Sequence, residues 1–349
     1  MKLVLLMIAV VACLDVFIAC QTASTRPSKP PAKTKAQIET ENKAFAETKA
    51  KADQGFAGGQ YSLGWMYRYG KGVKQDFKEA VKWYQKAADQ GYAEAQTSLW
   101  IGEMYQQGQG VNQDYAKALE WYHKSAEQNN PYAQTNLGAM YRDGQGVKQY
   151  FKEAVKWYQK AAEQEHVKAQ ANLGFMYERG QGVELDSKEA VKWYQKAADQ
   201  GYAGAQTNLG WMYHEGQGVE QNFKEAVKWN LKAADQGHAK AQCNLGVMYH
   251  QGQGVDQDIK EAVKWYRKSA DQGDPLAQCN LGVMYERGQG VDQDDVIAYA
   301  WCNIAATNGD HNVRKVLSIV AKEMTPAQIA KAEELVKEMV KKNPKLLNK

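Results

Sequence analysis

The chain of 349 residues carries 44 Lys and Arg against 40 Asp and Glu, so its formal net charge is only +4. A net charge this small over this length does not give the positively charged surface that binds nucleic acid, and we expect no nucleic-acid partner. Hydrophobic residues make up 44% of the chain, which is enough to build a core and excludes disorder throughout.

Residues 1–19 are predicted to be a signal peptide. A single basic residue, Lys2, precedes an apolar run over residues 3–14 that Asp15 interrupts, and this run is too short for a stable membrane-spanning helix. Residues 17–20, Phe-Ile-Ala-Cys, resemble the lipobox of bacterial lipoproteins, which makes Cys20 the expected lipidation site. The alternative is an ordinary exported protein that is cut near Cys20.

Residues 20–40 are expected to form a disordered tether, because Ser, Thr, Pro and Lys dominate the stretch after Cys20 and offer nothing to bury. We therefore expect an exported protein in the periplasm or at the outer membrane, anchored there by its N-terminal lipid. That lipid is the only expected contact with the membrane. A secreted protein is the alternative.

Between residues 41 and 309 one sequence unit recurs seven times. Its tryptophans lie 38 residues apart at the first interval and 36 residues apart at the next five, and a tyrosine and a glycine of the unit keep the same spacing. The tryptophans are Trp83, Trp121, Trp157, Trp193, Trp229, Trp265 and Trp301.

Each unit is predicted to be a pair of amphipathic helices. In the fifth unit, apolar residues recur at helical spacing over residues 203–216 and again over residues 222–236. Gly216 and Gly218 between them suit left-handed backbone positions, which end a helix and turn the chain. In the first unit, Asp76 and Glu79 predict a capping box at the start of the second helix. No stretch carries hairpin signals, so the fold class is all-α.

One helix pair cannot cover its own apolar face, so seven pairs are expected to stack into a single solenoid over residues 41–309. Before the first unit, within the solenoid range, Lys51 occupies a position that is apolar in the units, as a solvent-facing cap requires. Residues 310–349 are predicted to form C-terminal capping helices and a tail, with a helix start at Thr325.

The unit reads A-x-x-L-G-x-M-Y-x-x-G-x-G-V-x-x-D-x-x-K-E-A-x-x-W-Y-x-K-A-A-x-Q-G, which resembles the Sel-one-like repeat (SLR) of tetratricopeptide-like proteins, of the bacterial exported or lipoprotein type. The resemblance implies an all-α, right-handed α-solenoid of seven helix-pair repeats with capping helices. It further implies a non-catalytic scaffold or adaptor that binds a protein or peptide in the envelope or at the cell surface. A cysteine-rich branch of the family is linked to weak β-lactam binding or hydrolysis.

The chain carries no recognisable catalytic motif, and we expect no enzyme activity, no cofactor and no metal. A helix rather than a strand precedes each Gly-Gln-Gly, which makes these glycines turn residues rather than a dinucleotide site. Equivalent histidines of adjacent units, His214 and His250, should lie about 10 Å apart, too far to share one zinc ion. Two alternatives stay open: a β-lactam-binding or hydrolysing enzyme of the cysteine-rich branch, and a structural spacer.

The cysteines after the signal peptide leave two interpretations open. Cys243 and Cys279 occupy the same position in adjacent units and should lie too far apart to form a disulfide. Cys279 and Cys302 should face each other across a turn and could pair, or they could be small buried core residues. The disulfide ladder of the cysteine-rich branch is absent from the sequence.

Partner-binding residues are sought at positions of the first helix that vary between units, because packing explains the constant ones. The resemblance places these positions in the concave groove of the solenoid, and it suggests that the near-constant asparagines bond a peptide backbone there. A merely solvated face, with the asparagines bonding between helices, is the alternative. The candidates are Trp65, Arg68, Tyr69, Trp100, Asn136, Arg142, Asn172, Phe175, Arg179, Asn208, Trp211, His214, Asn244, His250, Asn280 and Arg287.

The second unit has two extra residues in its first helix. If Ile101 takes the usual leucine position, Trp100 falls in the asparagine position of the groove. Two extra residues would turn a helix by about 200°, so the added length is better placed at the helix start. We expect Trp100, beside Trp65 and Arg68, to be the main anchor of a monomeric binding protein. The alternative is that Leu99 and Trp100 cover a widened gap between the first and second units.

Overall fold

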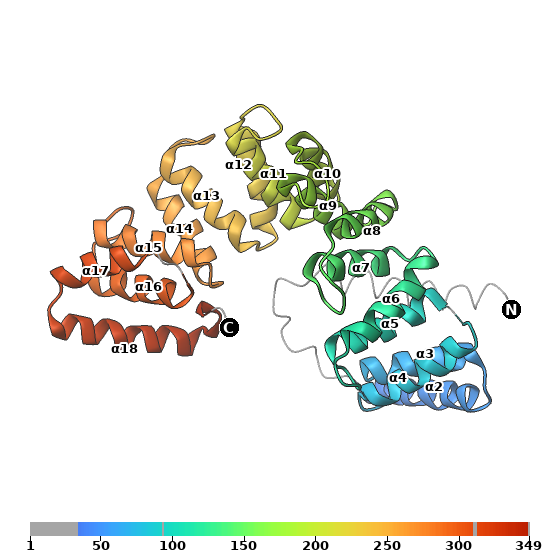
Figure 1. Ribbon diagram of the computed structural model, residues 1–349. Helices are drawn as coiled ribbons and strands as arrows, with labels where there is room; N and C mark the ends of the chain where they lie inside the picture. Colours follow the sequence, from blue (N-terminus) through green and yellow to red (C-terminus); the bar gives the residue numbers. More distant parts are fainter. Residues whose placement is uncertain (1–33, 93, 310–312, 348–349) are drawn as a thin grey trace. The chain divides into compact units, whose positions relative to one another are not determined.

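The computed structural model describes residues 34–92, 94–309 and 313–347 (Figure 1). The predicted signal peptide, Cys20 and most of the predicted tether lie outside these residues. All regular elements in the described ranges are helices, and no strand occurs there, so the predicted all-α fold is confirmed. The chain falls into two compact units that meet between Ala197 and Ala198, here called the N-terminal and C-terminal units.

The helices of the N-terminal unit are α2 (Lys35–Asp53), α3 (Ala57–Tyr69), α4 (Phe77–Asp89), α5 (Glu94–Gln107), α6 (Tyr115–Glu127), α7 (Pro131–Asp143), α8 (Phe151–Glu163), α9 (Val167–Arg179) and most of α10 (Ser187–Asp199). Those of the C-terminal unit are α11 (Ala203–Glu215), α12 (Phe223–Asp235), α13 (Ala239–Gln251), α14 (Ile259–Ala270), α15 (Pro275–Arg287), α16 (Asp295–Thr307), α17 (Val313–Glu323), α18 (Pro326–Lys342) and the short η1 (Pro344–Leu346).

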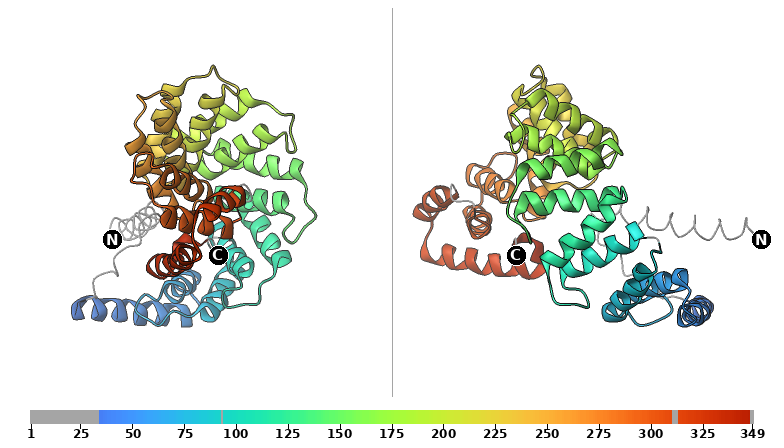
Figure 2. Two further views of the ribbon diagram at one scale, coloured as in Figure 1. Left: turned by 90° about the vertical axis from the view of Figure 1, so that its left-hand side faces the viewer. Right: turned by 45° about the vertical axis from the view of Figure 1, so that its right-hand side comes forward.

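Helices α3 to α16 form seven consecutive helix pairs, which we call repeats 1 to 7. Within each unit the paired helices lie side by side and follow one another in chain order (Figure 1, Figure 2). Within each unit, contacts run between the two helices of a repeat, as between α7 and α8, and between a second helix and the first helix of the next repeat, as between α8 and α9. This nearest-neighbour packing is that of a solenoid, with α2 before the repeats and α17 and α18 after them.

The tether ends earlier than predicted, because α2 already begins at Lys35. Thr34 caps the helix: its hydroxyl accepts a hydrogen bond from the Gln37 backbone, and the Gln37 side chain accepts one from the Thr34 backbone. This capping box lies at the edge of the Pro/Lys-rich stretch, where composition alone suggested disorder. Ala52 is buried and Lys51 is exposed, as expected of a cap.

The turn inside each repeat depends on two glycines, which confirms the turn interpretation of the Gly-Gln-Gly motifs. In repeat 3 Gly144 ends α7 with φ 69°. Gly146, with φ 71°, lies so close to the previous repeat that a Cβ atom would come within 2.6 Å of the Tyr115 backbone. The second glycine therefore permits both the left-handed backbone and the close approach of adjacent repeats.

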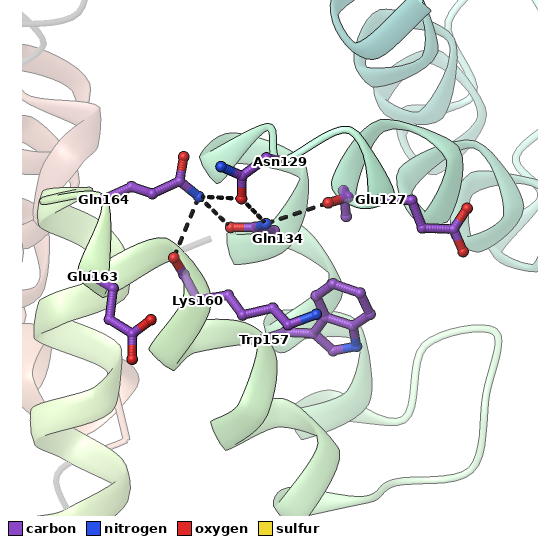
Figure 3. A pocket seen from close by; sticks show the side chains of 8 residues that line it. Glu127, Asn129, Gln134, Trp157, Lys160, Glu163 and Gln164 are labelled. Carbon is purple, nitrogen blue, oxygen red and sulfur yellow. Dashed lines mark hydrogen bonds between the residues drawn. The ribbon is translucent and has the colours of Figure 1, made fainter.

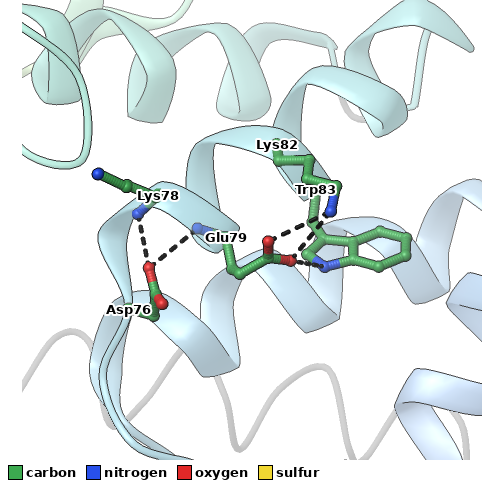
Figure 4. A network of polar contacts seen from close by, with 5 residues as sticks. All are labelled: Asp76, Lys78, Glu79, Lys82 and Trp83. Carbon is green, nitrogen blue, oxygen red and sulfur yellow. Dashed lines mark hydrogen bonds and ion pairs between the residues drawn. The ribbon is translucent and has the colours of Figure 1, made fainter.

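Most second helices begin at a side-chain cap, but the capping box predicted in repeat 1 forms only in part (Figure 4). The Asp76 carboxylate accepts hydrogen bonds from the backbone N–H groups of Lys78 and Glu79, at 2.9 and 3.1 Å. The Glu79 carboxylate does not return to the backbone of Asp76. It accepts instead from the indole Nε1 of Trp83 at 3.1 Å and from Lys82 Nζ at 3.2 Å.

Repeat 2 accommodates its extra residues at the start of α5, as predicted. Ile101 is fully buried, and the following Gly102 faces the ring of Tyr122 just as Gly64 faces Tyr84 in repeat 1. Ile101 therefore occupies the usual leucine position. Leu99 is also buried, in a cluster with residues of repeat 3.

The C-terminal residues form the two predicted capping helices. Thr325 starts α18 with a capping box to Gln328, and α16 packs against both α17 and α18. Beyond α18, Leu346 of η1 is only 2% exposed and belongs to the core cluster of repeat 7. No helix among the described residues has the length and apolar character to cross a membrane.

No disulfide joins the cysteines of the described ranges, Cys243, Cys279 and Cys302, so the alternative of a Cys279–Cys302 disulfide is not realised. Cys243 and Cys302 are buried and Cys279 is partly buried against the same cluster as Cys302. Burial raises the pKa of the Cys243 thiol well above its usual range. These cysteines act as small core residues.

Candidate partner-binding surface

All the predicted partner-binding residues lie on the first helices of the repeats. Most of them are half-buried, and only Tyr69, Arg179 and Arg287 are exposed. Trp65, Phe175 and Trp211, the aromatic candidates expected to offer an exposed ring to a partner, are each partly covered by the fold.

In the N-terminal unit, four predicted residues meet at the junction of repeats 1 and 2. The Arg68 guanidinium lies over the Trp100 ring, 4.2 Å from its centroid, and 5.5 Å from the centroid of Tyr69. The rings of Tyr69 and Trp65 lie 5.2 Å apart. We call Trp65, Arg68, Tyr69 and Trp100 the aromatic–arginine cluster.

Glu103 holds Arg68 in place within this cluster. Its carboxylate lies 2.6 Å from Arg68 Nη2, and the two side chains are only 22% and 11% exposed. Burial by itself lowers the pKa of Arg68, but the hydrogen bond and charge of Glu103 outweigh that effect and raise the pKa above its usual value. Arg68 therefore stays charged while its position is fixed.

Trp100 has two roles in the structure. Its indole Nε1 donates a hydrogen bond to the Tyr61 hydroxyl at 3.3 Å, and its ring packs against the cores on both sides. The alternative of Leu99 and Trp100 covering a gap between repeats 1 and 2 holds for Trp100 only, because Leu99 packs with residues of repeats 2 and 3. Trp100 also forms the wall against which Arg68 lies, so the two interpretations are compatible.

Two buried polar atoms beneath the cluster have no hydrogen-bond partner among the described residues. They are Arg68 Nη1 and the hydroxyl of Tyr84. Burial raises the pKa of Tyr84 well above its usual range, and the nearby Arg68 acts in the opposite direction. A buried polar atom without a hydrogen-bond partner lowers the stability of the folded protein, because it has lost its bonds to water.

Further along the N-terminal unit the predicted residues bond to one another. Arg142 donates to both carboxylate oxygens of Asp143, at 2.7 and 3.0 Å, and to Asn172 Oδ1 at 3.4 Å. In repeat 4 the Arg179 guanidinium lies 5.7 Å from the centroid of Phe175. These are small polar and aromatic groups rather than one continuous patch.

In the C-terminal unit the predicted residue His214 is held by contacts of both ring nitrogens. Its Nδ1 lies 2.7 Å from Glu215, its Nε2 lies 2.8 Å from Gln253 Oε1 of the next repeat, and its ring stacks edge-on to Phe223. Arg287 pairs with Glu286 at 3.2 Å. The remaining predicted residues of this unit are half-buried on their helices: Asn208, Trp211, Asn244, His250 and Asn280.

The asparagines are partly engaged in the fold. Asn172 accepts from Arg142 at 3.4 Å, and Asn244 donates to Asn230 Oδ1 at 3.1 Å. These two asparagines bond between helices, as the alternative expected. Each keeps part of its side chain exposed.

The sequence analysis missed Glu103 and Tyr61 as members of this surface. Glu103 occupies the varying position that Trp65 occupies one repeat earlier, where a carboxylate opposite Arg68 was a visible signal. No comparable signal marked Tyr61. Within the described residues, no group of three or more His, Cys, Asp or Glu side chains could hold a metal ion.

Comparisons with known proteins follow the repeat boundaries. The Sel1 repeat model matches residues 57–92, 98–130, 131–166, 167–202, 203–238, 239–274 and 275–310. A Sel1 repeat protein from Oxalobacter formigenes is 34% identical, with 83% of each chain covered and a TM-score of 0.66. A protective antigen of uropathogenic Escherichia coli with an SLR fold is 28% identical, with 86% of this chain and 96% of the antigen covered and a TM-score of 0.50. No curated protein matches the chain.

Proposed function

The chain belongs to the Sel1 repeat family, and from this premise we propose that it is a non-catalytic scaffold that binds a protein or peptide on the first-helix surface of its repeats. Sel1 repeat proteins are in general protein-interaction scaffolds. In this chain the binding surface is centred on the aromatic–arginine cluster. The partner is a polypeptide whose apolar or aromatic side chain packs against Trp65 and Tyr69.

The observation that carries the proposal is the preorganisation of the cluster. Aromatic residues and arginine dominate the binding energy of protein interfaces. Here Glu103 and Trp100 fix Arg68, and the exposed Tyr69 stacks on Trp65, so little side-chain entropy is left to lose on binding.

Site-specific photocrosslinking from position 69 tests the proposal in the native envelope. Tyr69 is 44% exposed, so a benzophenone side chain there should crosslink a partner, and Trp65→Ala should weaken binding of the captured partner about tenfold or more. The matched control is Tyr150→Ala, since Tyr150 is 54% exposed on a turn outside the cluster. Equal effects of both changes would contradict the assignment of the surface, and a spacer would give no specific crosslink at all.

The same preparation tests for enzyme activity. Purified protein should not turn over a chromogenic β-lactam above the level of a Trp65→Ala/Trp211→Ala control. Clear turnover that the control lacks would replace the scaffold with a catalyst.

We also propose that the protein is exported, lipid-anchored through Cys20 and monomeric. The lipobox-like residues 17–20 and the tether-like composition after them support the anchor. Cys20→Ala should move the protein from the membrane fraction to the soluble fraction after cell lysis. A variant that stays with the membranes would contradict the anchor, and light scattering of the soluble variant measures its oligomeric state.

A further inference from the structure

A pair of side-chain amides joins the two helices of a repeat at the edge opposite the glycine turn. In repeat 3, Gln164 Nε2 donates to Gln134 Oε1 at 2.7 Å, and Gln134 Nε2 donates to the carbonyl of Ala126 at the end of α6, at 3.2 Å. The same amide pair recurs as Gln90–Gln60, Gln236–Gln206, Gln272–Gln242 and Asn308–Gln278.

In repeat 7 the chain's own C-terminal segment is bound to this amide pair. The carbonyl of Leu346 accepts from both members, Gln278 Nε2 at 3.0 Å and Asn308 Nδ2 at 2.6 Å. The side chain of Leu346 is buried in the cluster that contains Trp301 and Ile304. Asn343 adds a bond to the backbone carbonyl of Asp271 at 2.7 Å. Residues 343–347 thus lie on the repeat as a bound peptide would.

The equivalent site in repeat 3 is an open pocket (Figure 3). Its lining residues Ala126, Gln134, Trp157 and Gln164 stand 144 positions before Ala270, Gln278, Trp301 and Asn308 of the occupied site. The side-chain oxygen of Asn129 accepts from Gln134 Nε2 and from Gln164 Nε2, both at 3.1 Å. Asn129 therefore stands in for the carbonyl that Leu346 supplies in repeat 7.

The rim of the open pocket differs from the occupied site in charge. Lys160 replaces Ile304 and its Nζ lies 4.5 Å from the centroid of the Trp157 ring. Glu127 and Glu163 also line the pocket, where repeat 7 has Asp271 and Thr307. Two carboxylates against one ammonium favour a ligand with a basic residue beside its apolar one.

We propose that the open pocket of repeat 3 binds a short turn-forming segment of a partner protein that presents a leucine next to a basic residue, as Asn343–Leu347 does in repeat 7. The leucine lies against Trp157 and Ala126. Its carbonyl replaces the Asn129 side chain as the acceptor of the hydrogen bonds from Gln134 and Gln164. This site lies at the other end of the repeats from the aromatic–arginine cluster, so it is a second binding surface beyond the function proposed above.

A fluorescein-labelled peptide with the sequence of residues 340–349 probes the site, with binding to the full chain followed by fluorescence anisotropy. We expect saturable binding of this peptide. A peptide that carries Leu346→Ala should bind with an affinity at least about tenfold lower, because the buried leucine supplies most of the apolar contact. In the protein, Gln164→Leu should weaken binding about fivefold through the lost amide donor.

A gain of affinity is the sharper test. Asn129→Gly removes the side chain that competes for the amide donors and should strengthen peptide binding. The change suits the backbone, since Asn129 has φ 62° and glycine stands at the equivalent position before repeats 2, 5, 6 and 7. A peptide affinity that neither Asn129→Gly nor Gln164→Leu changes would overturn the proposal.

Three further variants separate this site from its neighbours. Gln149→Leu is the matched control, because Gln149 only bonds the carbonyl of Arg142 and a leucine, Leu185, stands at the same position of repeat 4. It should leave the peptide affinity unchanged. Leu346→Ala in the protein frees the site of repeat 7. Binding seen only in that variant would show that repeat 7 alone recognises the segment, which would also overturn the proposal. Trp65→Ala should leave peptide affinity unchanged, so this test and that of the proposed function fail independently.

Discussion

At the scale of single residues, a tyrosine of the second helix and a glycine of the first helix fit together in most repeats. The ring of Tyr158 lies over Gly138, where a Cβ atom would come within 2.5 Å of the ring. Burial raises the pKa of this phenol well above its usual range. Repeats 5 and 7 replace the tyrosine with Asn230 and Cys302, and the glycine still faces them. The glycine thus sets the distance between the two helices of a repeat.

Gly138→Ala tests this contact. The added methyl group must push the ring of Tyr158 or the helix aside, so the change should lower the free energy of unfolding by about 1–3 kcal/mol, as overpacking does in a tight core. Chemical denaturation followed by circular dichroism measures the loss. Gly204→Ala is the control, because its nearest neighbour is the outer part of the exposed Tyr202 ring at 3.1 Å. There the helix propensity of alanine should dominate, with a gain of up to about 1 kcal/mol. A loss at both positions would contradict the packing argument.

At the scale of the helix, the second helices start at an Asp or Asn cap in almost every described repeat. Asp76, Asp114, Asn222, Asp258 and Asp294 each accept a hydrogen bond from the first turn. Helix α8 is the exception, since its N-cap residue Tyr150 makes no side-chain bond and is exposed. The start of α8 therefore leaves backbone donors to water alone.

Restoring the cap should stabilise repeat 3. Tyr150→Asp is expected to raise the free energy of unfolding by about 1 kcal/mol, because the carboxylate can accept from the N–H groups of the first turn. Tyr150→Ala removes the same ring without adding an acceptor and should bring no such gain. Urea titrations of the three proteins measure the difference, and equal stability of the Asp and Ala variants would count against the cap.

Another helix start makes stability depend on pH. His166 precedes α9, and its Nδ1 lies 2.8 Å from the Thr135 hydroxyl, which itself donates to the carbonyl of Pro131. Burial, with a smaller effect from Lys168, lowers the pKa of His166 from 6.5 to about 4. The unfolded chain therefore binds the proton first as the pH falls. The stability that the neutral ring contributes is present above pH 6.5 and is lost progressively between pH 6.5 and about pH 4.

His166→Tyr isolates this effect, because tyrosine stands at the same position as Tyr92 and Tyr202. Between pH 7 and pH 4 the parent protein should lose more stability than the variant, by on the order of 1–2 kcal/mol, less than a fully buried ring would give. Unfolding measured at a series of pH values checks this. Parallel pH profiles of the two proteins would show that His166 does not titrate as argued.

At the scale of the molecule, stability is a sum of contacts within repeats and between neighbouring repeats. The apolar faces of the first and last repeats therefore need capping helices to cover them. Helix α2 covers repeat 1, and α17, α18 and the segment 343–347 cover repeat 7. Leu346 is the buried contact of that last segment.

Leu346→Ala should therefore act locally. The lost contact with Trp301 and Ile304 should destabilise repeat 7 by about 2–4 kcal/mol, as large-to-small changes do in a core. Hydrogen exchange should rise in α15 and α16 and stay unchanged in α3 to α8. Leu276→Ala in the same repeat removes a leucine that is 54% exposed and should have little effect. Faster exchange along the whole chain would contradict nearest-neighbour stability.

Most of the fold could be predicted from the sequence because the same local pattern of residues occurs in each of the seven repeats. The spacing of tryptophan, tyrosine and glycine predicted seven helix pairs, the glycine turns and the position of Ile101 in the longer repeat. Capping residues at Asp76 and Thr325 marked helix starts. The early start of α2 was missed because composition hid the short capping signal at Thr34.

The sequence by itself therefore determined the helix pairs, their number and the side each apolar residue faces, since these follow from spacing within one repeat. Only the tertiary structure decided which varying residues meet. Arg68 finds Glu103 and Trp100, the asparagines bond to neighbouring helices, and Leu346 reaches the amides of Gln278 and Asn308. Such contacts join residues 14 to 68 positions apart, and they depend on the distance and angle between packed helices, which no spacing within a single repeat specifies.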